Sequence, residues 1–275
     1  MGYMGQPLKR REDLRFLRGK GRYVDDLTLP NMTWCVFVRS PHAHAAIRSI
    51  DITAAIDMPG VLKVLTHDHW QAAGLGELTV VHPMPFGDGR PMNEAPRPAF
   101  ASDKVRHVGD VVAAVIAETR HQAEDAAEKV GVDYGVLPAV TDVSRALDAD
   151  APVIHEAFDN NIVFEIEKGD PAATERALEG ADHIVEMTLP SNRVAGSPME
   201  PRSYLCDFDP NTERYTFYAT SQTPHYLKRW LAVYTLFVPE HKIRVIAPDV
   251  GGGFGLKVHY SVEAPTVAWA SGLLG

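Results

Sequence analysis

The sequence predicts a mixed α/β (α+β) protein built from about two domains. The chain has 275 residues, of which 45% are hydrophobic, and this is enough for a sizeable core at about 150 residues per domain. Short apolar segments typical of strands alternate with segments of helical periodicity. A break in this pattern falls near residues 138–152, between Pro138 and Pro152. We therefore divide the chain into an arm at 1–22, a first domain at 23–145 and a second at 146–275.

The first domain is predicted to hold several strands and one clear helix. Residues 33–40 have the composition of a buried strand, and 49–66 predict a strand, a short helix, a Pro-Gly turn and another strand. Residues 109–134 predict a strand, a helix and a strand, which implies a right-handed βαβ crossover. The helix begins at an N-cap, Thr119, with Gln122 as its capping-box partner. Its buried face and its C-terminal stop are expected at Ala123, Ala126, Ala127 and Val130, and at Gly131.

A long surface loop and a second set of elements follow. Proline and glycine in 82–99 predict a loop within the first domain. Residues 170–180 predict a helix with Asp170 as its N-cap and Pro171 at its first position. Later segments predict three strands, an amphipathic helix and a final strand, at 182–189, 202–209, 214–220, 224–237 and 242–250.

Composition excludes several classes of function. The net charge of −9 and the pI of about 5.7 argue against non-specific nucleic-acid binding, which needs a basic face. Two cysteines, Cys35 and Cys206, fit a reducing cytoplasm and cannot supply an all-cysteine iron–sulfur cluster. The longest apolar run, 111–117, is too short to span a membrane, and no secretory signal is expected. The basic segment 9–22 is either a solvated arm or an arm that docks on a partner subunit.

The stretch APDVGGGFGLKVHY, residues 247–260, contains four glycines in five positions. Glycine costs backbone entropy wherever it is ordered, so this stretch needs a reason. It matches neither G-x-G-x-x-G nor the phosphate-loop pattern, because Leu256, Lys257 and Val258 occupy the wrong positions. A glycine-rich turn remains. It either presents backbone N–H groups to an oxyanion or a metal's oxo group, or is a tight turn packed on a neighbouring strand.

A family resemblance adds to these patterns. DVGGGFGLK, preceded by SQTPH at 221–225, resembles the molybdenum-binding subunit of the xanthine oxidase family of molybdenum hydroxylases. That family includes xanthine and aldehyde oxidoreductases and the large subunits of aerobic carbon monoxide dehydrogenases. Residues 21–51 and 105–140 resemble the family's first strands and its α/β hammerhead domain, and 192–209 resemble the opening of its molybdenum domain.

The resemblance implies a cofactor site in the second domain. The glycines at 251, 252, 253 and 255 would let the backbone approach the molybdenum cofactor closely. Gly251, Gly252, Gly253 and Gly255 would thus contact the cofactor, Phe254 would lie at the edge of the substrate cavity, and the Gln222 amide would donate a hydrogen bond to an oxygen of the molybdenum. No direct metal ligand and no catalytic base are assigned in this chain.

The resemblance also implies cofactors and partners. The cofactor would be molybdopterin, in its cytosine dinucleotide form, with [2Fe–2S] clusters and FAD on partner subunits. The reaction would oxidise an aldehyde, an N-heterocycle or carbon monoxide with oxygen derived from water. Family members are much longer, so a further chain is expected to complete the molybdenum domain. Purine-specific members carry a glutamate where this chain has Val258, which disfavours a purine substrate.

Three other features carry alternative readings. The pairs His42/His44 and His67/His69 could hold zinc on a strand, but no third ligand is evident, and surface or loop histidines are the favoured reading. Glu200 could be a general base, although the family pattern favours a role in the framework of the site. A non-catalytic scaffold that keeps the fold without metal is the alternative function.

Overall fold

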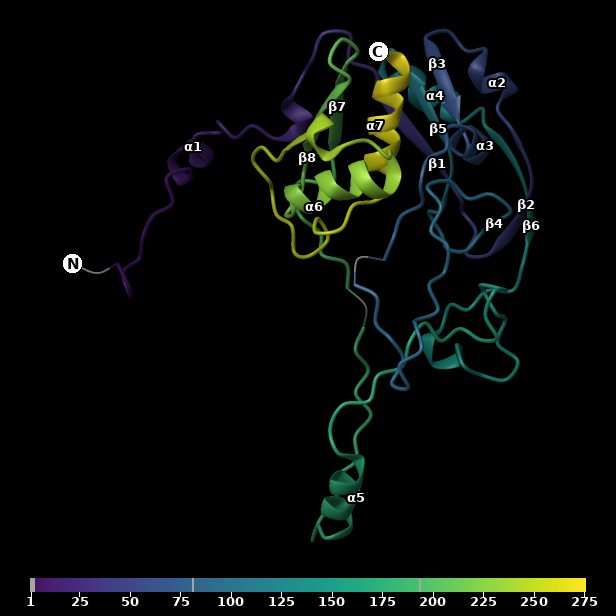
Figure 1. The fold of residues 1–275 in the computed structure, drawn as a ribbon, viewed down its shortest axis with the longest axis vertical. Coiled ribbons are helices and arrows are strands. Elements are labelled where there is room, and N and C mark those ends of the chain that lie inside the picture. Colours follow the sequence, from purple (N-terminus) through teal and green to yellow (C-terminus); the bar gives the residue numbers. More distant parts are fainter. Residues whose placement is uncertain (1–2, 81, 193) are drawn as a thin grey trace.

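The computed structural model describes residues 3–80, 82–192 and 194–275. Figure 1 shows two bodies side by side, one carrying β1 to β6 and the other carrying β7, β8, α6 and α7. Two segments leave these bodies. One holds α1 (Asp13–Leu17) near the N-terminus, and the other holds α5 (Pro171–Glu179) at its tip.

The first body contains the antiparallel sheet β1-β5-β3, formed by Trp34–Arg39, Val111–Ala117 and Val61–Leu65. The central strand β5 is buried along its whole length, as its unbroken apolar sequence predicts. Helix α4 (Arg120–Ala127) covers this sheet. Thr119 caps it by accepting a hydrogen bond from the Gln122 N–H, and Ala123 and Ala126 are fully buried. The predicted N-cap and buried face of this helix are confirmed.

The second sheet of this body has the order β4-β2-β6, formed by Lys104–Val105, Ala45–Asp51 and Gly131–Val136. The predicted βαβ crossover is wrong, because β6 pairs antiparallel with β2 and not with β5. The reason is that β1 and β3 already occupy both edges of β5. Gly131 is also not the helix stop: α4 ends at Ala127, and Gly131 opens β6. Short helices α2 (Thr53–Ile56) and α3 (His67–Ala72) complete this body.

The proline-rich loop is confirmed, since residues 82–99 lie in neither a helix nor a strand where they are described. Backbone hydrogen bonds attach the loop to the neighbouring chain, for example from the Leu78 N–H to the Arg97 carbonyl at 3.0 Å. Four single turns occur elsewhere, at Val24–Asp26, Val143–Arg145, Glu240–Lys242 and, as a π-helix, Trp230–Thr235.

The second body is built on the sheet β7-β8-β9, formed by Tyr204–Asp209, Arg214–Ala219 and Ile243–Ile246. β7 and β8 are antiparallel, whereas β8 and β9 are parallel. The connection between β8 and β9 runs through α6 (Pro224–Arg229) and the π-helix, so the predicted helix at 224–237 is present as two joined pieces. Helix α7 (Glu263–Leu274) packs on the sheet. Strand β9 is shorter than predicted and leaves 247–250 to lead into the glycine stretch.

The predicted strand at 182–189 is wrong for the described chain. This segment has no regular structure and is exposed throughout, because no other strand lies beside it to pair with its backbone. The predicted helix before it is confirmed as α5, with the Asp170 side chain accepting from Ala173 N–H at 2.9 Å.

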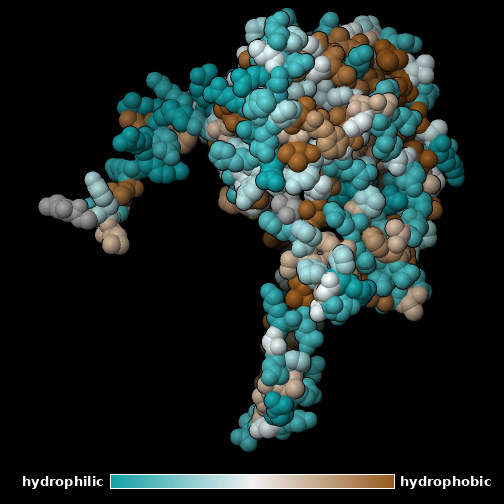
Figure 2. Space-filling model, in the orientation of Figure 1, coloured by the Kyte–Doolittle hydropathy of each residue, from teal (hydrophilic) through white to brown (hydrophobic). Residues whose placement is uncertain are grey.

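The two bodies share one hydrophobic core. Trp70 of α3 meets Trp269 of α7 edge to face, with ring centroids 5.4 Å apart, and both belong to the same buried cluster as Phe100 and Phe217. The surface of the bodies mixes polar and apolar residues, and the segment around α1 is mainly hydrophilic (Figure 2). Because the core crosses between the bodies, the division at residue 145 stays a prediction.

Candidate functional site

The glycine stretch is a loop that follows β9 and is folded back on itself. Gly252 and Gly255 have φ of 97° and 86°, and Phe254 between them has φ of 50°. Positive φ is inexpensive for glycine alone, so positions 252 and 255 need glycine for their backbone conformation. Phe254 carries the strain of an unusual conformation for a bulky residue, and its side chain is 75% exposed.

Contacts within the chain explain two further glycines. A Cβ at Gly251 would lie 2.6 Å from the Cβ of Glu200, and one at Gly253 would lie 2.4 Å from the Gln222 side chain. Both distances are too short for real atoms, so a larger side chain at Gly251 would clash with the Glu200 Cβ, and one at Gly253 would have to push the Gln222 amide aside. By contrast, a Cβ at Gly255 would meet nothing within 4 Å. The loop is therefore closely packed on one side and open at Gly255.

A buried ion pair fastens the two ends of the loop. The Glu200 Oε2 atom accepts from the Gly251 N–H at 2.7 Å and from Lys257 Nζ at 2.9 Å. The Lys257 side chain is fully buried, and the Glu200 side chain is 10% exposed. The Glu200 N–H also donates to the Gly251 carbonyl at 3.3 Å. Glu200 thus belongs to the framework of the loop, and its neutralised, buried carboxylate does not resemble a general base that can reach solvent.

Gln222 lies beside the same loop, just before α6. Its backbone N–H donates to the Lys257 carbonyl at 2.9 Å, and its side-chain Oε1 accepts from the Gly255 N–H at 3.1 Å. The amide nitrogen of Gln222 has no acceptor among the described residues. The structure therefore brings Gln222 and Gly251 to Gly255 together, and it leaves the amide NH2 group free to donate elsewhere.

Three consecutive backbone donors in the loop are also unused. Within the described chain, the N–H groups of Gly252, Gly253 and Phe254 have no acceptor, whereas those of Gly251 and Gly255 are hydrogen-bonded. Successive N–H groups in a backbone that alternates the sign of φ form concavities that bind anions. Together with the Gln222 amide, they make a set of donors suited to oxygen atoms that carry negative charge.

The N-terminal arm reaches the residue that precedes the loop. Both nitrogens of the Arg15 fork pair with Asp249, one of them at 2.6 Å, and the Arg22 N–H donates to Asp249 at 2.7 Å. The hydrogen bond from Arg15 lowers the pKa of Asp249 to about 2. The basic segment 9–22 is therefore not a wholly solvated arm, because it contacts its own chain. Sequence reasoning missed Asp249 and Lys257, since only the fold shows which charged residues meet.

The histidine pairs form no shared site. The Nδ1 atom of His44 lies 2.7 Å from the Pro138 carbonyl oxygen, and His42 packs edge-on against Tyr134. His67 contacts the Phe100 carbonyl, while His69 caps its own helix at Thr66. Residues 3–80, 82–192 and 194–275 contain no group of three or more His, Cys, Asp or Glu side chains placed to hold a metal.

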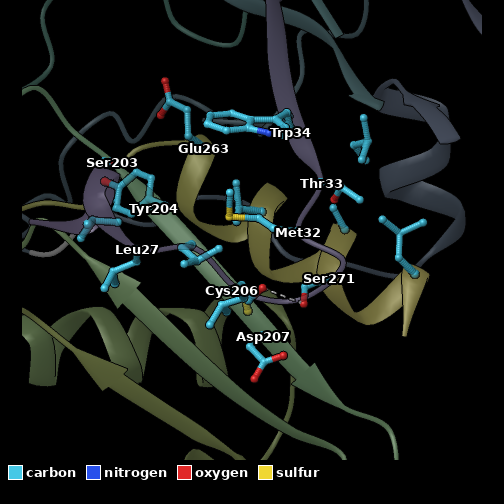
Figure 3. Close-up of a pocket in the computed structure, with 18 of the residues that line it drawn as sticks. Leu27, Met32, Thr33, Trp34, Ser203, Tyr204, Cys206, Asp207, Glu263 and Ser271 are labelled. Atoms are coloured by element: carbon cyan, nitrogen blue, oxygen red, sulfur yellow. Dashed lines mark hydrogen bonds between the residues drawn. The ribbon is translucent and has the colours of Figure 1, made fainter. Parts of the chain in front are cut away.

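A cavity of about 580 Å³ lies elsewhere, between the two bodies. Figure 3 labels some of the residues that line it, which include Met32 and Trp34 from the N-terminal part of the chain and Tyr204, Cys206, Glu263 and Ser271 from the second body. Neither Gln222 nor the glycine loop lines it. Burial raises the pKa of both Cys35 and Cys206 to about 12, so these thiols are poor nucleophiles at neutral pH. The cavity is therefore not assigned any chemistry.

Comparisons with known proteins agree with the resemblance seen in the sequence. The family model for the aldehyde oxidase and xanthine dehydrogenase a/b hammerhead domain matches residues 18–138. The model for the molybdopterin cofactor-binding domain matches residues 154–275. The fold and the loop thus define a hammerhead domain joined to a molybdopterin cofactor-binding domain.

Individual relatives match this chain over nearly its whole length. The chain is 39% identical over 269 residues to the carbon monoxide dehydrogenase large chain of Afipia carboxidovorans, covering 93% of this chain and 32% of that protein. It is 35% identical over 270 residues to the nicotine 6-hydroxylase large subunit of Paenarthrobacter nicotinovorans, covering 98% and 32%. It superposes on quinoline 2-oxidoreductase from Pseudomonas putida 86 with a TM-score of 0.88 and 34% identity, covering 98% and 33%.

The chain belongs to the xanthine oxidase family of molybdenum hydroxylases and spans about a third of the length of these relatives. No helix in the described part of the chain is long and apolar enough to cross a bilayer.

Proposed function

We propose that this chain supplies the first part of the molybdenum-cofactor site of a multi-subunit molybdenum hydroxylase. The donors at Gln222, Gly252, Gly253 and Phe254 hold the oxygen atoms of the bound cofactor, and Gly251 and Gly255 complete the loop that makes this approach possible. The observation that carries the proposal is the set of unused donors, which all lie at one loop. Unpaired donors are costly unless water or a ligand satisfies them.

The residues present fit such a group. The Gln222 amide oxygen is already held by the Gly255 N–H, which fixes the orientation of the amide and directs its NH2 group away from that contact. A Cβ at Gly255 would meet no atom within 4 Å, so the loop is open on that side. Fixed dipoles of this kind stabilise developing charge without reorganising during the reaction. When bound, the molybdenum cofactor would supply the two-electron oxidation, while these residues hold and orient it.

The proposal extends to the rest of the enzyme. The cofactor is molybdopterin in its cytosine dinucleotide form, and the substrate is an aldehyde, an N-heterocycle or carbon monoxide. Electrons pass to [2Fe–2S] and FAD subunits, in the cytoplasm, and a further polypeptide completes the molybdenum domain. Relatives named as a carbon monoxide dehydrogenase and a nicotine 6-hydroxylase support this range of substrates. The chain matches only about a third of the length of these relatives, which supports the need for the remaining polypeptide.

One observation favours the alternative of a scaffold without metal. The packing of Gly251 and Gly253 against Glu200 and Gln222, and the positive φ of Gly252 and Gly255, explain the glycines without any ligand. A tight turn could therefore keep all four glycines in a protein that binds no cofactor. Molybdenum analysis of the purified assembly separates the two functions.

A matched pair of glycine variants makes the test local. Gly255→Ala and Gly74→Ala both place a Cβ on a residue with positive φ, 86° and 67°, and neither Cβ meets an atom within 4 Å. Both should lose about 1 kcal/mol of stability. Only Gly255→Ala should lower the molybdenum and pterin content per mole of the assembled protein. If Gly255→Ala keeps its full molybdenum and pterin content and is as stable as Gly74→Ala, the loop is an ordinary tight turn and the proposed cofactor contact is wrong.

A further inference from the structure

The chain leaves its sheet just before the glycine loop and is held there by the N-terminal arm. Strand β9 ends at Ile246, two residues before Pro248. Proline has no N–H to donate to a neighbouring strand, so pairing with β8 cannot continue through residue 248. In the described chain, the hydrogen bonds of residues 247–250 all go to Arg15 and Arg22. The arm therefore takes the place of a neighbouring strand for this segment.

The contact between the arm and Asp249 is built from backbone and side-chain bonds together. The Asp249 N–H donates to the Arg22 carbonyl at 3.1 Å, and the Arg22 N–H donates to the Asp249 carboxylate at 2.7 Å. Both nitrogens of the Arg15 fork donate to the same carboxylate. A bidentate pair of arginine and carboxylate fixes geometry as well as contributing energy. Asp249, two residues before Gly251, is thereby fixed in place.

The arm is folded so that it can make this contact. Arg15 also donates to the Lys20 carbonyl at 3.2 Å, and the Lys20 N–H donates to the Arg15 carbonyl at 3.0 Å, so residues 15–20 form a closed turn. The ring of Tyr23, directly after the arm, lies 3.4 Å from the place that a Cβ at Gly251 would take. The start of the glycine loop therefore touches the chain on both sides of Arg22.

The arm adds little to the hydrophobic core. Helix α1 buries none of its residues, and Leu14 and Leu17 are 56% and 85% exposed. Figure 1 shows α1 standing apart from the two bodies. In the described chain, Arg15 is the one basic side chain of the arm that bonds to the second body. The attachment of the arm is thus concentrated at the residue that leads into the glycine loop.

We propose that the N-terminal arm is part of the cofactor site and that Arg15 is a positioning residue. It holds Asp249 so that the three unused N–H groups of the glycine loop stay directed at the oxygen atoms of the bound cofactor. This rests on the proposed function. Groups that bind a ligand must be kept within about 0.5 Å of the productive position by the residues behind them. A loop rich in glycine has many accessible conformations, so its geometry depends on how its two ends are anchored.

The two anchors lie on opposite sides of the loop. Lys257 and Glu200 fasten the end that follows the glycines, and Glu200 also accepts from the Gly251 N–H. Arg15 fastens the end that precedes them, through Asp249. Because the Arg15 charge is matched by the Asp249 carboxylate, the arm acts on the loop through position and not through its net charge.

The first experiment compares two arginine variants of the arm. Arg15→Met keeps the apolar stem and removes the fork, and it should lower the molybdenum and pterin content per mole of the purified assembly about tenfold or more, as is usual for residues that support the direct contacts of a site. Arg10→Met is the matched control, since Arg10 pairs only with Asp13 inside the arm, at 2.9 Å, and its cofactor content should equal that of the wild type. Arg15→Lys keeps the charge without the fork and should restore part of the content.

The second measurement is independent of the cofactor. In the assembly produced without molybdenum, the Gly251 and Gly255 amides, which bond to Glu200 and Gln222, should exchange their hydrogens about tenfold faster in Arg15→Met, because the loop opens locally. Amides of β5 should be unchanged. The Arg15 side chain is 41% exposed, so the melting temperature should fall by no more than about 4 °C. A larger fall with faster exchange in β5 would show that the arm supports the whole fold, and it would overturn the proposal.

The outcomes separate the role of the arm from the proposed function. A wild-type assembly that contains molybdenum, together with an Arg15→Met assembly that contains as much, overturns the role of the arm alone, whatever the exchange at Gly251 and Gly255. A wild-type assembly that contains neither molybdenum nor pterin overturns the proposed function and the role of the arm together. Equal loss of cofactor in Arg10→Met and Arg15→Met would attribute the effect to the charge of the arm, and it also overturns the proposal.

Discussion

The ion pair between Lys257 and Glu200 should be the most sensitive single point of the glycine loop. The two charges lie 2.9 Å apart, with Lys257 fully buried and Glu200 10% exposed. The Glu200 Oε1 atom is buried and has no partner among the described residues. Lys257→Met would keep the apolar stem of the side chain while removing its charge, so a buried carboxylate would remain without its cation.

The expected loss is large. Removing one partner of a buried pair costs about 3–5 kcal/mol, a substantial part of the roughly 5–15 kcal/mol by which domains are stable. At about 2–4 °C for each kcal/mol, the melting temperature should fall by about 6–20 °C. Urea unfolding followed by tryptophan fluorescence and circular dichroism would measure the same difference in free energy.

Two further variants make this result specific. Glu200→Gln combined with Lys257→Met removes both charges and leaves an oxygen to accept from the Gly251 N–H, so most of the stability should return. Lys242→Met breaks a surface pair with Glu213 at 3.3 Å and an exposed hydrogen bond to the Thr212 carbonyl at 2.8 Å, and it should cost less than about 1 kcal/mol. A Lys257→Met variant as mild as Lys242→Met would refute the buried pair. A double variant as unstable as Lys257→Met would instead attribute the loss to packing of the lysine stem.

Three other predictions concern the site and its surroundings. Gln222→Ala should lower the turnover of the loaded enzyme about a hundredfold, by roughly 3 kcal/mol of barrier, with molybdenum content unchanged; wild-type turnover would remove Gln222 from the site. The pKa of Asp249 is lowered to about 2 by the hydrogen bond from Arg15, so the stability that this contact provides is complete above about pH 4 and is lost as the pH falls through 2. Titration followed by NMR should show the Asp249 pKa returning toward about 3.9 in Arg15→Ala, and an unchanged value would contradict the pairing. Burial raises the pKa of Cys35 and Cys206 to about 12, and both half-buried residues line the cavity, so a thiol reagent at neutral pH should label them far more slowly in the native protein than after unfolding, and equal labelling rates in the two states would contradict the raised pKa.

Local patterns in the sequence determined most of the secondary structure. Thr119 and Asp170 begin α4 and α5 because their side chains accept from nearby backbone N–H groups, an interaction that spans three residues and needs no tertiary partner. The continuous apolar run at 111–117 is a fully buried strand for a similarly simple reason, since no polar face is present. The glycine loop and the SQTPH segment also identified the family, because their residue order is specific.

Strand partners were decided only by tertiary structure. The sequence of a strand predicts which of its faces is buried, but it does not predict which other strand pairs with its edge. For that reason β6 joins β2 rather than β5, and 182–189 remains unpaired although its sequence is that of a strand. Strand pairing joins residues that are distant in the chain, and the availability of an edge depends on every other strand in the fold.

The sequence by itself determined the family and predicted a candidate site at Gln222 and the glycines at 251–253 and 255. Only the tertiary structure decided what holds the site in place. Lys257, Asp249 and Arg15 were given no role from the sequence, because the sequence does not show whether a charged side chain is buried, and Glu200 was placed in the framework only by the family pattern. Their roles come from burial and from contacts that join residues 15, 200, 249 and 257 in space, and these depend on how the whole chain packs.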